Sequence, residues 1–96
     1  MLSEKELTPT NTRQCELLYL TRIDKDKAAA GNRGVIESIS LKPLPVTSTD
    51  DIHRQMLESG DPFRKFFIVD AAVQTVNGMP SAYKVTRLHD ICDIEE

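Results

Sequence analysis

At 96 residues, the chain can form one domain but not two. Hydrophobic residues make up 40% and charged residues 28%, which excludes a disordered chain and is typical of a folded domain. The net charge of −3 argues against a strongly basic nucleic-acid binder and against a dense DNA mimic.

Both ends of the chain are polar. We predict a flexible arm over residues 1–12, a single α+β domain over residues 13–94 and the end of an acidic tail at residues 95–96. Because no apolar signal segment stands at the N-terminus and no apolar run reaches membrane-spanning length, we expect a cytoplasmic protein without a membrane partner. Cys15 and Cys92 are then expected as free thiols, with a disulfide as the alternative.

The first predicted strand covers residues 14–24. Cys15, Leu17, Tyr19, Thr21 and Ile23 share one parity, although Leu18 and Leu20 blur the alternation. A period of two with aromatic and β-branched residues favours a strand over a helix. The charged, glycine-containing residues 25–34 that follow are typical of a loop.

Residues 35–46 are expected to form the second strand. Pro43 and Pro45 remove two backbone donors, so the far end of this strand must lie at a sheet edge or leave the sheet.

The clearest helix of the chain follows that strand. Residues 48–51 offer several N-cap side chains and place acids at the helix N-terminus. Ile52, Met56 and Leu57 then fall on one face, and Gly60 with the Asp-Pro pair after it ends the helix.

The most apolar segment covers residues 64–76. Phe66, Phe67 and their neighbours are apolar on both parities, which is typical of a central strand. Asn77 and Gly78 then predict a hairpin, because both residues tolerate positive φ, and Met79 and Pro80 are expected to lengthen its loop. Residues 83–94 follow as the return strand; a helix that begins after Ser81 is the alternative for this segment.

The order of these elements predicts an α+β fold. A ββαββ chain most simply forms a four-stranded antiparallel sheet with the helix packed on one face. Since the strand at residues 64–76 is apolar on both faces, we expect the other face of the sheet to be covered by a second copy in a homodimer or by a protein partner.

Groups that could carry chemistry are few. His89 and Cys92 lie three positions apart, which on a strand sends their side chains to opposite faces, and only the fold could bring Cys15 and His53 to them to complete a zinc site. Neither a nucleophile elbow nor a cysteine flanked by a family signature is present. We therefore predict no catalytic residue, no metal ligand and no cofactor, and a protein that is not an enzyme.

By elimination, the sequence favours a small accessory or regulatory protein that acts by binding another protein. An inhibitor, immunity or adaptor protein of a phage or other mobile element fits this description. The residues expected to form the contact are on the apolar strand: Phe66, Phe67, Val69 and Ala71, or the opposite face of that strand.

The alternative is a nucleic-acid-binding protein, although nucleic acid is not the favoured partner. If the last two strands pair, they bring basic residues near one another and offer one tyrosine for base stacking. The residues of this predicted basic strip are Arg64, Lys65, Tyr83, Lys84 and Arg87.

Overall fold

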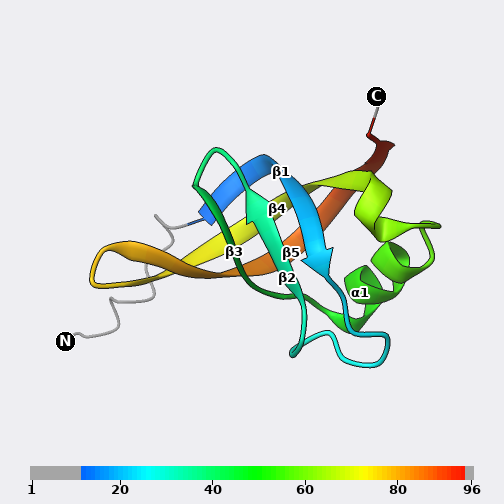
Figure 1. Ribbon diagram of the computed structural model, residues 1–96, viewed down its shortest axis with the longest axis horizontal. Coiled ribbons are helices and arrows are strands. Elements are labelled where there is room, and N and C mark those ends of the chain that lie inside the picture. Colours follow the sequence, from blue (N-terminus) through cyan, green and yellow to red (C-terminus); the bar gives the residue numbers. More distant parts are fainter. Residues whose placement is uncertain (1–11, 95–96) are drawn as a thin grey trace.

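The computed structural model describes residues 12–94 and shows five strands, one α-helix and one short 3-10 helix (Figure 1). The elements in chain order are β1 (Thr12–Arg22), β2 (Arg33–Ile36), β3 (Ser40–Thr47), α1 (Asp50–Leu57), η3 (Pro62–Arg64), β4 (Lys65–Val76) and β5 (Met79–Asp93). The predicted arm, apart from Thr12, and the predicted tail end lie outside the described residues.

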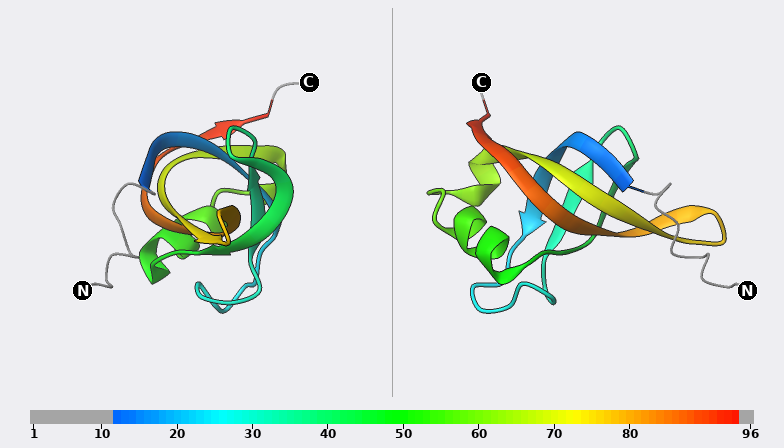
Figure 2. Two further views of the ribbon diagram at one scale, coloured as in Figure 1. Left: turned by 90° about the vertical axis from the view of Figure 1, so that its left-hand side faces the viewer. Right: turned by 180° about the vertical axis from the view of Figure 1, so that it is seen from behind.

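The five strands form a closed barrel in the order β1-β2-β3-β5-β4, and the ring is visible in the end-on view of Figure 2. All neighbouring pairs are antiparallel except β3 and β5, which run parallel. Because β4 returns beside β1 after three consecutive strands, the strand order 4-1-2-3 is a Greek key.

The prediction of an α+β fold with a four-stranded antiparallel sheet and one helix packed on one face (ββαββ) is wrong. Residues 35–46 do not form one strand, because a turn at residues 37–39 separates β2 from β3, and the Ile39 N–H donates to the Ile36 carbonyl at 2.9 Å. The pairing of β1 with β4 then closes the sheet. Each strand therefore has a neighbour on both sides over part of its length, and the predicted sheet with two free edge strands does not form.

The barrel interior holds the hydrophobic core. Along β4, alternate residues point inward and are buried, whereas their neighbours are only half-buried, as the period of a strand requires. In β1 the inward residues are Leu18 and Leu20, the parity opposite to the predicted one. The core also includes Ile36, Leu44, Val46, Val73, Tyr83, Val85 and, from α1, Ile52 and Met56.

Helix α1 lies at one end of the barrel, between β3 and β4 in the chain, and confirms the predicted helix (Figure 1). Thr49 is its N-cap and accepts a hydrogen bond from the Ile52 N–H at 3.2 Å. Among the residues described, no helix is long and apolar enough to cross a membrane.

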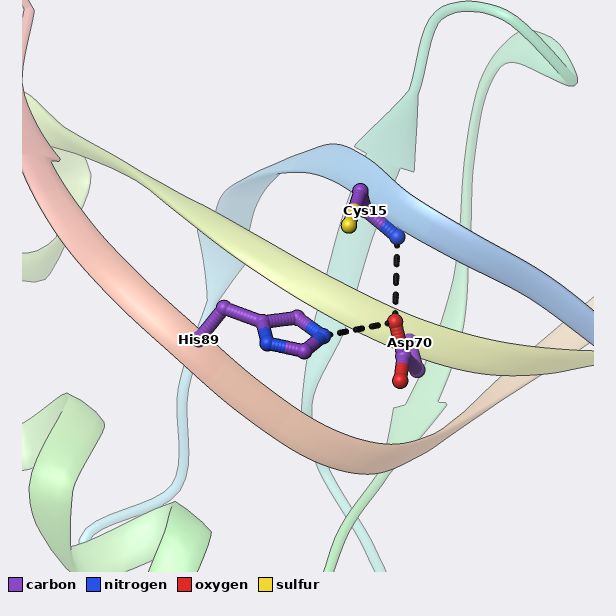
Figure 3. A group of neighbouring side chains, drawn as sticks. All are labelled: Cys15, Asp70 and His89. Atoms are coloured by element: carbon purple, nitrogen blue, oxygen red, sulfur yellow. Dashed lines mark hydrogen bonds and ion pairs between the residues drawn. The ribbon is translucent and has the colours of Figure 1, made fainter.

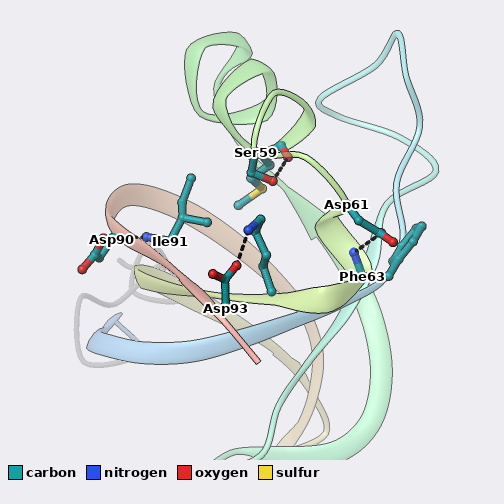
Figure 4. A network of polar contacts seen from close by, with 8 residues as sticks. Ser59, Asp61, Phe63, Asp90, Ile91 and Asp93 are labelled. Carbon is teal, nitrogen blue, oxygen red and sulfur yellow. Dashed lines mark hydrogen bonds and ion pairs between the residues drawn. The ribbon is translucent and has the colours of Figure 1, made fainter. Parts of the chain in front are cut away.

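Polar contacts hold the segment after α1 in shape and join the start of β4 to the end of β5 (Figure 4). Ser59 Oγ donates to the Met56 carbonyl at 2.7 Å, and the Phe63 N–H donates to Asp61 at 3.1 Å. Lys65, the first residue of β4, forms an ion pair with Asp93, the last residue of β5. The Ile94 N–H donates to the Arg64 carbonyl at 3.1 Å, so the end of the described chain is also fastened to η3.

The β4–β5 hairpin projects from the opposite end of the barrel (Figure 1). Asn77 and Gly78 have φ of 53° and 79°, so the predicted hairpin is confirmed. Its loop is shorter than predicted, because Val76 pairs directly with Met79 and residues 79–80 already belong to β5. Because β5 continues to Asp93, residues 83–93 form a strand and not the alternative helix.

Candidate functional site

The residues predicted to contact a protein partner fall on two sides of the barrel wall. Phe67, Val69 and Ala71 each have 0% exposure and face the interior, so a partner cannot reach them while the barrel is closed. Phe66 is half-buried on the outer side. The apolar character of β4 on both parities therefore has two sources, the core inside and a patch outside.

The outer apolar patch consists of Leu17 and Tyr19 on β1 and Phe66 and Ile68 on β4. Leu17 lies opposite Ile68 in the pairing of the two strands, and the rings of Tyr19 and Phe66 lie 5.8 Å apart between centroids. Leu17 is 42% exposed. Between β1 and the β2–β3 turn, a hollow of about 290 Å³ is lined by Cys15, Glu16, Leu17, Tyr19, Glu37 and Ser38.

The structure does not bring the predicted basic strip together. Tyr83 lies in the core with 0% exposure, so it cannot stack on a base. Lys65 is opposite Asp93 at one end of the β4–β5 pair, whereas Lys84 is opposite Ala72, seven residues further along β4 and about 23 Å away at the rise of a strand. Arg87 faces Asp70 across the two strands, and Arg64 lies in η3.

A different pair of cations lies on β1 and β2. Arg22 and Arg33 are direct partners in the ladder, and both are exposed. Like charges directly opposite each other destabilise a sheet unless something offsets them. Within residues 12–94 neither side chain has an ion pair; Arg33 only donates to the Pro43 carbonyl, at 3.4 Å.

A cluster of chemically versatile side chains lies beside the outer apolar patch. Cys15, Asp70 and His89 come from β1, β4 and β5, three neighbouring strands (Figure 3). One sulfur, one carboxylate oxygen and one imidazole nitrogen from these residues all lie within 4.8 Å of one another. We call these three residues the Cys-Asp-His cluster.

Irregular strand pairing creates this cluster. The register of β1 against β4 shifts between Arg13 and Glu16, and Cys15 within that shift has a φ of 55°. The register of β5 against β4 shifts between the partners of Ile68 and Val69, which leaves His89 without a partner. Bulges of this kind turn side chains out of the regular alternation and are common beside functional sites.

Asp70 is the centre of the cluster. Its Oδ1 accepts the Cys15 backbone N–H at 3.0 Å and contacts His89 Nε2 at 2.8 Å. These two hydrogen bonds, the one from Cys15 first, hold the pKa of Asp70 below its usual value. Asp70 is therefore a carboxylate at neutral pH.

The orientation of His89 decides what the cluster can do. A nucleophilic triad needs one imidazole nitrogen on the acid and the other on the thiol. Here Nε2 is already on Asp70, and Figure 3 shows the second ring nitrogen on the side of the ring away from Cys15. The three side chains therefore cannot act as a catalytic triad in this orientation, because a triad passes the proton of the thiol through the imidazole ring. Their donor atoms instead converge on one point between the three strands.

Sequence reasoning placed Cys15 and His89 in a hypothetical zinc set and rejected it. The fold brings these two residues together, whereas His53 is buried against the loop between β1 and β2 and Cys92 lies opposite Phe66. Asp70 was missed, although one signal pointed to it: it is the only charged residue between Phe66 and Val76.

Comparisons with protein-family models, with curated proteins and with solved structures found no match.

Proposed function

We propose that this protein is a small non-enzymatic accessory protein that acts by binding another protein, of the inhibitor, immunity or adaptor type. The observation that carries the proposal is the outer apolar patch. A closed barrel buries its core inside, so apolar side chains on the outer wall are not needed for that core. An apolar group of neighbours on an outer surface marks an interaction site.

The composition of the patch supports this proposal. It combines two aromatic rings with Leu17 and Ile68, and aromatic residues are enriched in the buried centres of protein interfaces. Glu16 lies at its border, as expected for a polar rim around an apolar centre. Because β1 and β4 pair with each other across the patch, a partner at this surface docks on side chains and adds no strand between them.

The test attaches a photo-crosslinking side chain at Ile68 in the full chain, expressed in its native cells. We expect a crosslink to a discrete protein from position 68, and none from Leu41, which is 78% exposed on β3 outside the patch and serves as the matched control. Equal crosslinking at both positions, or none at 68, would contradict the proposal.

Self-association is distinguished by mass. Light scattering of the purified protein over a range of concentrations shows whether a second copy is the partner. If it is, Leu17→Lys reduces the mass to that of a monomer, whereas Leu41→Lys leaves it unchanged. Loss of association in both variants would point to a nonspecific effect of added charge.

Nucleic-acid binding is the second candidate function, and the paired Arg22 and Arg33 favour it. Both lie on the first two strands of a five-stranded Greek-key barrel. OB-folds share that architecture and bind oligonucleotides on their barrel strands and adjoining loops, although a fold alone does not establish a function. Phosphate is the anion that two opposed arginines would take.

A gel shift with single-stranded DNA at low salt tests this candidate. We expect retardation that weakens steeply as salt rises and that is lost in the Arg22→Ala, Arg33→Ala double variant. Lys84→Ala, a change to an exposed cation elsewhere on the barrel, is the control. Absence of retardation in the unmodified protein at tens of micromolar (about the range of weak nonspecific binding) would end the idea.

A further inference from the structure

The Cys-Asp-His cluster is built to receive a metal ion. Three strands each supply one donor to it, and the irregular pairing of β1 and β5 aims two of those donors at the third. We propose that Cys15, Asp70 and His89 bind one zinc ion, or a related divalent transition metal, on the outer wall of the barrel. This site is independent of the proposed protein-binding function.

The donor set selects the class of metal. A thiolate, an imidazole and a carboxylate are the three ligand types that zinc uses in proteins. Calcium and magnesium take oxygen ligands and have no use for Cys15 or His89. The site therefore disfavours calcium and magnesium through the type of its donor atoms and not through the size of the ion that fits.

The geometry is close to that of a bound site. With metal–ligand bonds of about 2.0–2.3 Å in a tetrahedron, donor atoms lie about 3.5 Å apart. His89 Nε2 and Asp70 Oδ1 are 2.8 Å apart in a direct hydrogen bond and must separate by about 0.7 Å to admit the ion, while the three donors lie within 4.8 Å. Side-chain rotation of Cys15 brings its sulfur closer, because Cys15 is exposed and forms no disulfide.

Binding the ion requires a defined movement of protons. The Cys15 thiol loses its proton to solvent, so that the thiolate sulfur is the donor. When the imidazole is neutral, its single proton moves to Nδ1 as Nε2 takes the metal. One proton is thus released for each ion bound, and Asp70 already carries its negative charge.

Three protein donors leave the fourth position of a tetrahedral ion open. Structural zinc sites are closed by four protein ligands, whereas sites with three keep a water or an exchangeable ligand. The side chain of His89 is 34% exposed and that of Asp70 is 17% exposed, so solvent reaches the cluster. Water fills the fourth position.

The experiment uses the untagged, reduced full-length protein and zinc or cobalt chloride as the probe. Iodoacetamide labelling, read by mass spectrometry at each cysteine, measures protection by zinc. We expect zinc to protect Cys15 and to leave the labelling of Cys92 unchanged, which makes Cys92 an internal control. Cobalt should add the near-ultraviolet charge-transfer band of a cobalt–thiolate bond.

The variants test each ligand. Cys15→Ser should abolish the cobalt charge-transfer band, and Asp70→Asn and His89→Gln should each weaken zinc binding more than the roughly 10–100-fold that loss of an outer-shell partner costs. Cys92→Ser should bind as the unmodified protein does. Far-ultraviolet circular dichroism checks that every variant is folded. Equal zinc protection of both cysteines, no protection at micromolar zinc, or a cobalt band that survives Cys15→Ser would overturn the proposal.

Discussion

Asp24 organises the loop between β1 and β2. Its carboxylate accepts the backbone N–H groups of Asp26 at 2.8 Å and Lys27 at 3.0 Å. Its own carbonyl contacts Nε2 of the buried His53 at 2.7 Å, which fastens the loop to α1. The hydrogen bond from Asp26 is the main reason that the pKa of Asp24 lies below its ordinary value of 3.8.

Asp24→Asn should reduce the loss of stability in acid. A depressed folded-state pKa stabilises the protein above the unfolded value of 3.8, and this contribution disappears as pH falls through the lower folded value. The variant has no such charge to lose, so its free energy of unfolding should change less below pH 3.8. Urea denaturation at several pH values measures the free energy of unfolding, with Asp26→Asn as the control. If the unmodified protein and Asp24→Asn lose the same stability between neutral and acidic pH, the prediction is wrong.

Tyr83 carries a polar group into the core. Its hydroxyl is buried beside the Ile36 backbone without a hydrogen bond of normal geometry, and burial raises the pKa of the phenol above 10.0. An unpaired buried hydroxyl costs stability. Tyr83→Phe should therefore raise the free energy of unfolding by about 1 kcal/mol. A loss of stability in urea denaturation would show that the hydroxyl has a partner, such as a buried water.

The sequence could indicate some residues of the site and not others. His89 and Cys15 were visible as ligand types, but the sequence did not show that their strands both lie beside β4. The register shifts in β1 and β5 lie at these two residues and bring their side chains to Asp70. A bulge depends on pairing with a partner strand, and a single sequence does not show the pairing.

At the scale of elements, local chemistry predicted most of the structure. The helix with its cap at Thr49, the hairpin at Asn77 and Gly78 and the two long strands that flank it are all present. These depend on residues within a few positions of one another. The turn at residues 37–39 was missed, because it contains neither glycine nor proline and joins two strands with similar alternation.

Gly34 lets β1, β2 and β3 approach closely. A Cβ added there would lie 2.8 Å from Leu18 Cδ1 and 2.9 Å from the Tyr19 backbone oxygen. The Leu18 side chain can move away from the added methyl group, but the backbone of Tyr19 is held in the ladder between β1 and β2 and cannot. Gly34→Ala should therefore destabilise the protein by about 1–3 kcal/mol in urea denaturation. A variant as stable as the original would mean that β2 can shift without disturbing the barrel.

At the scale of the whole molecule, closure decides which side of each strand is core. The sequence showed that β4 is apolar on both parities, but it did not show which face the barrel would enclose. The pairing of β1 with β4 and of β3 with β5 joins segments far apart in the chain. Local patterns do not encode such contacts, so the sequence was interpreted as an open sheet.

Phe66 and Phe67 are adjacent in β4 but lie on opposite sides of the barrel wall, so substitutions at the two positions compare the outer surface with the core. Phe67 has 0% exposure in the core, and Phe67→Ala should cost about 3–5 kcal/mol of stability. Phe66 is half-buried on the outer wall, so Phe66→Ala should cost clearly less and should affect association instead. Thermal denaturation measures both variants. Equal losses would mean that the outer patch belongs to the core.

The distance along the chain between β1 and β4 also determines how the molecule folds. Thr12 finds its partner at Ala72, so the ring cannot close until the helix and the fourth strand have been made. Proteins dominated by such remote pairings refold in roughly milliseconds to seconds, well after helical bundles of equal size. Until β4 pairs with it, β1 has unpaired backbone N–H and C=O groups along the edge that β4 covers in the barrel. Unpaired strand edges promote aggregation, so the chain is most vulnerable before the β4–β5 hairpin has formed.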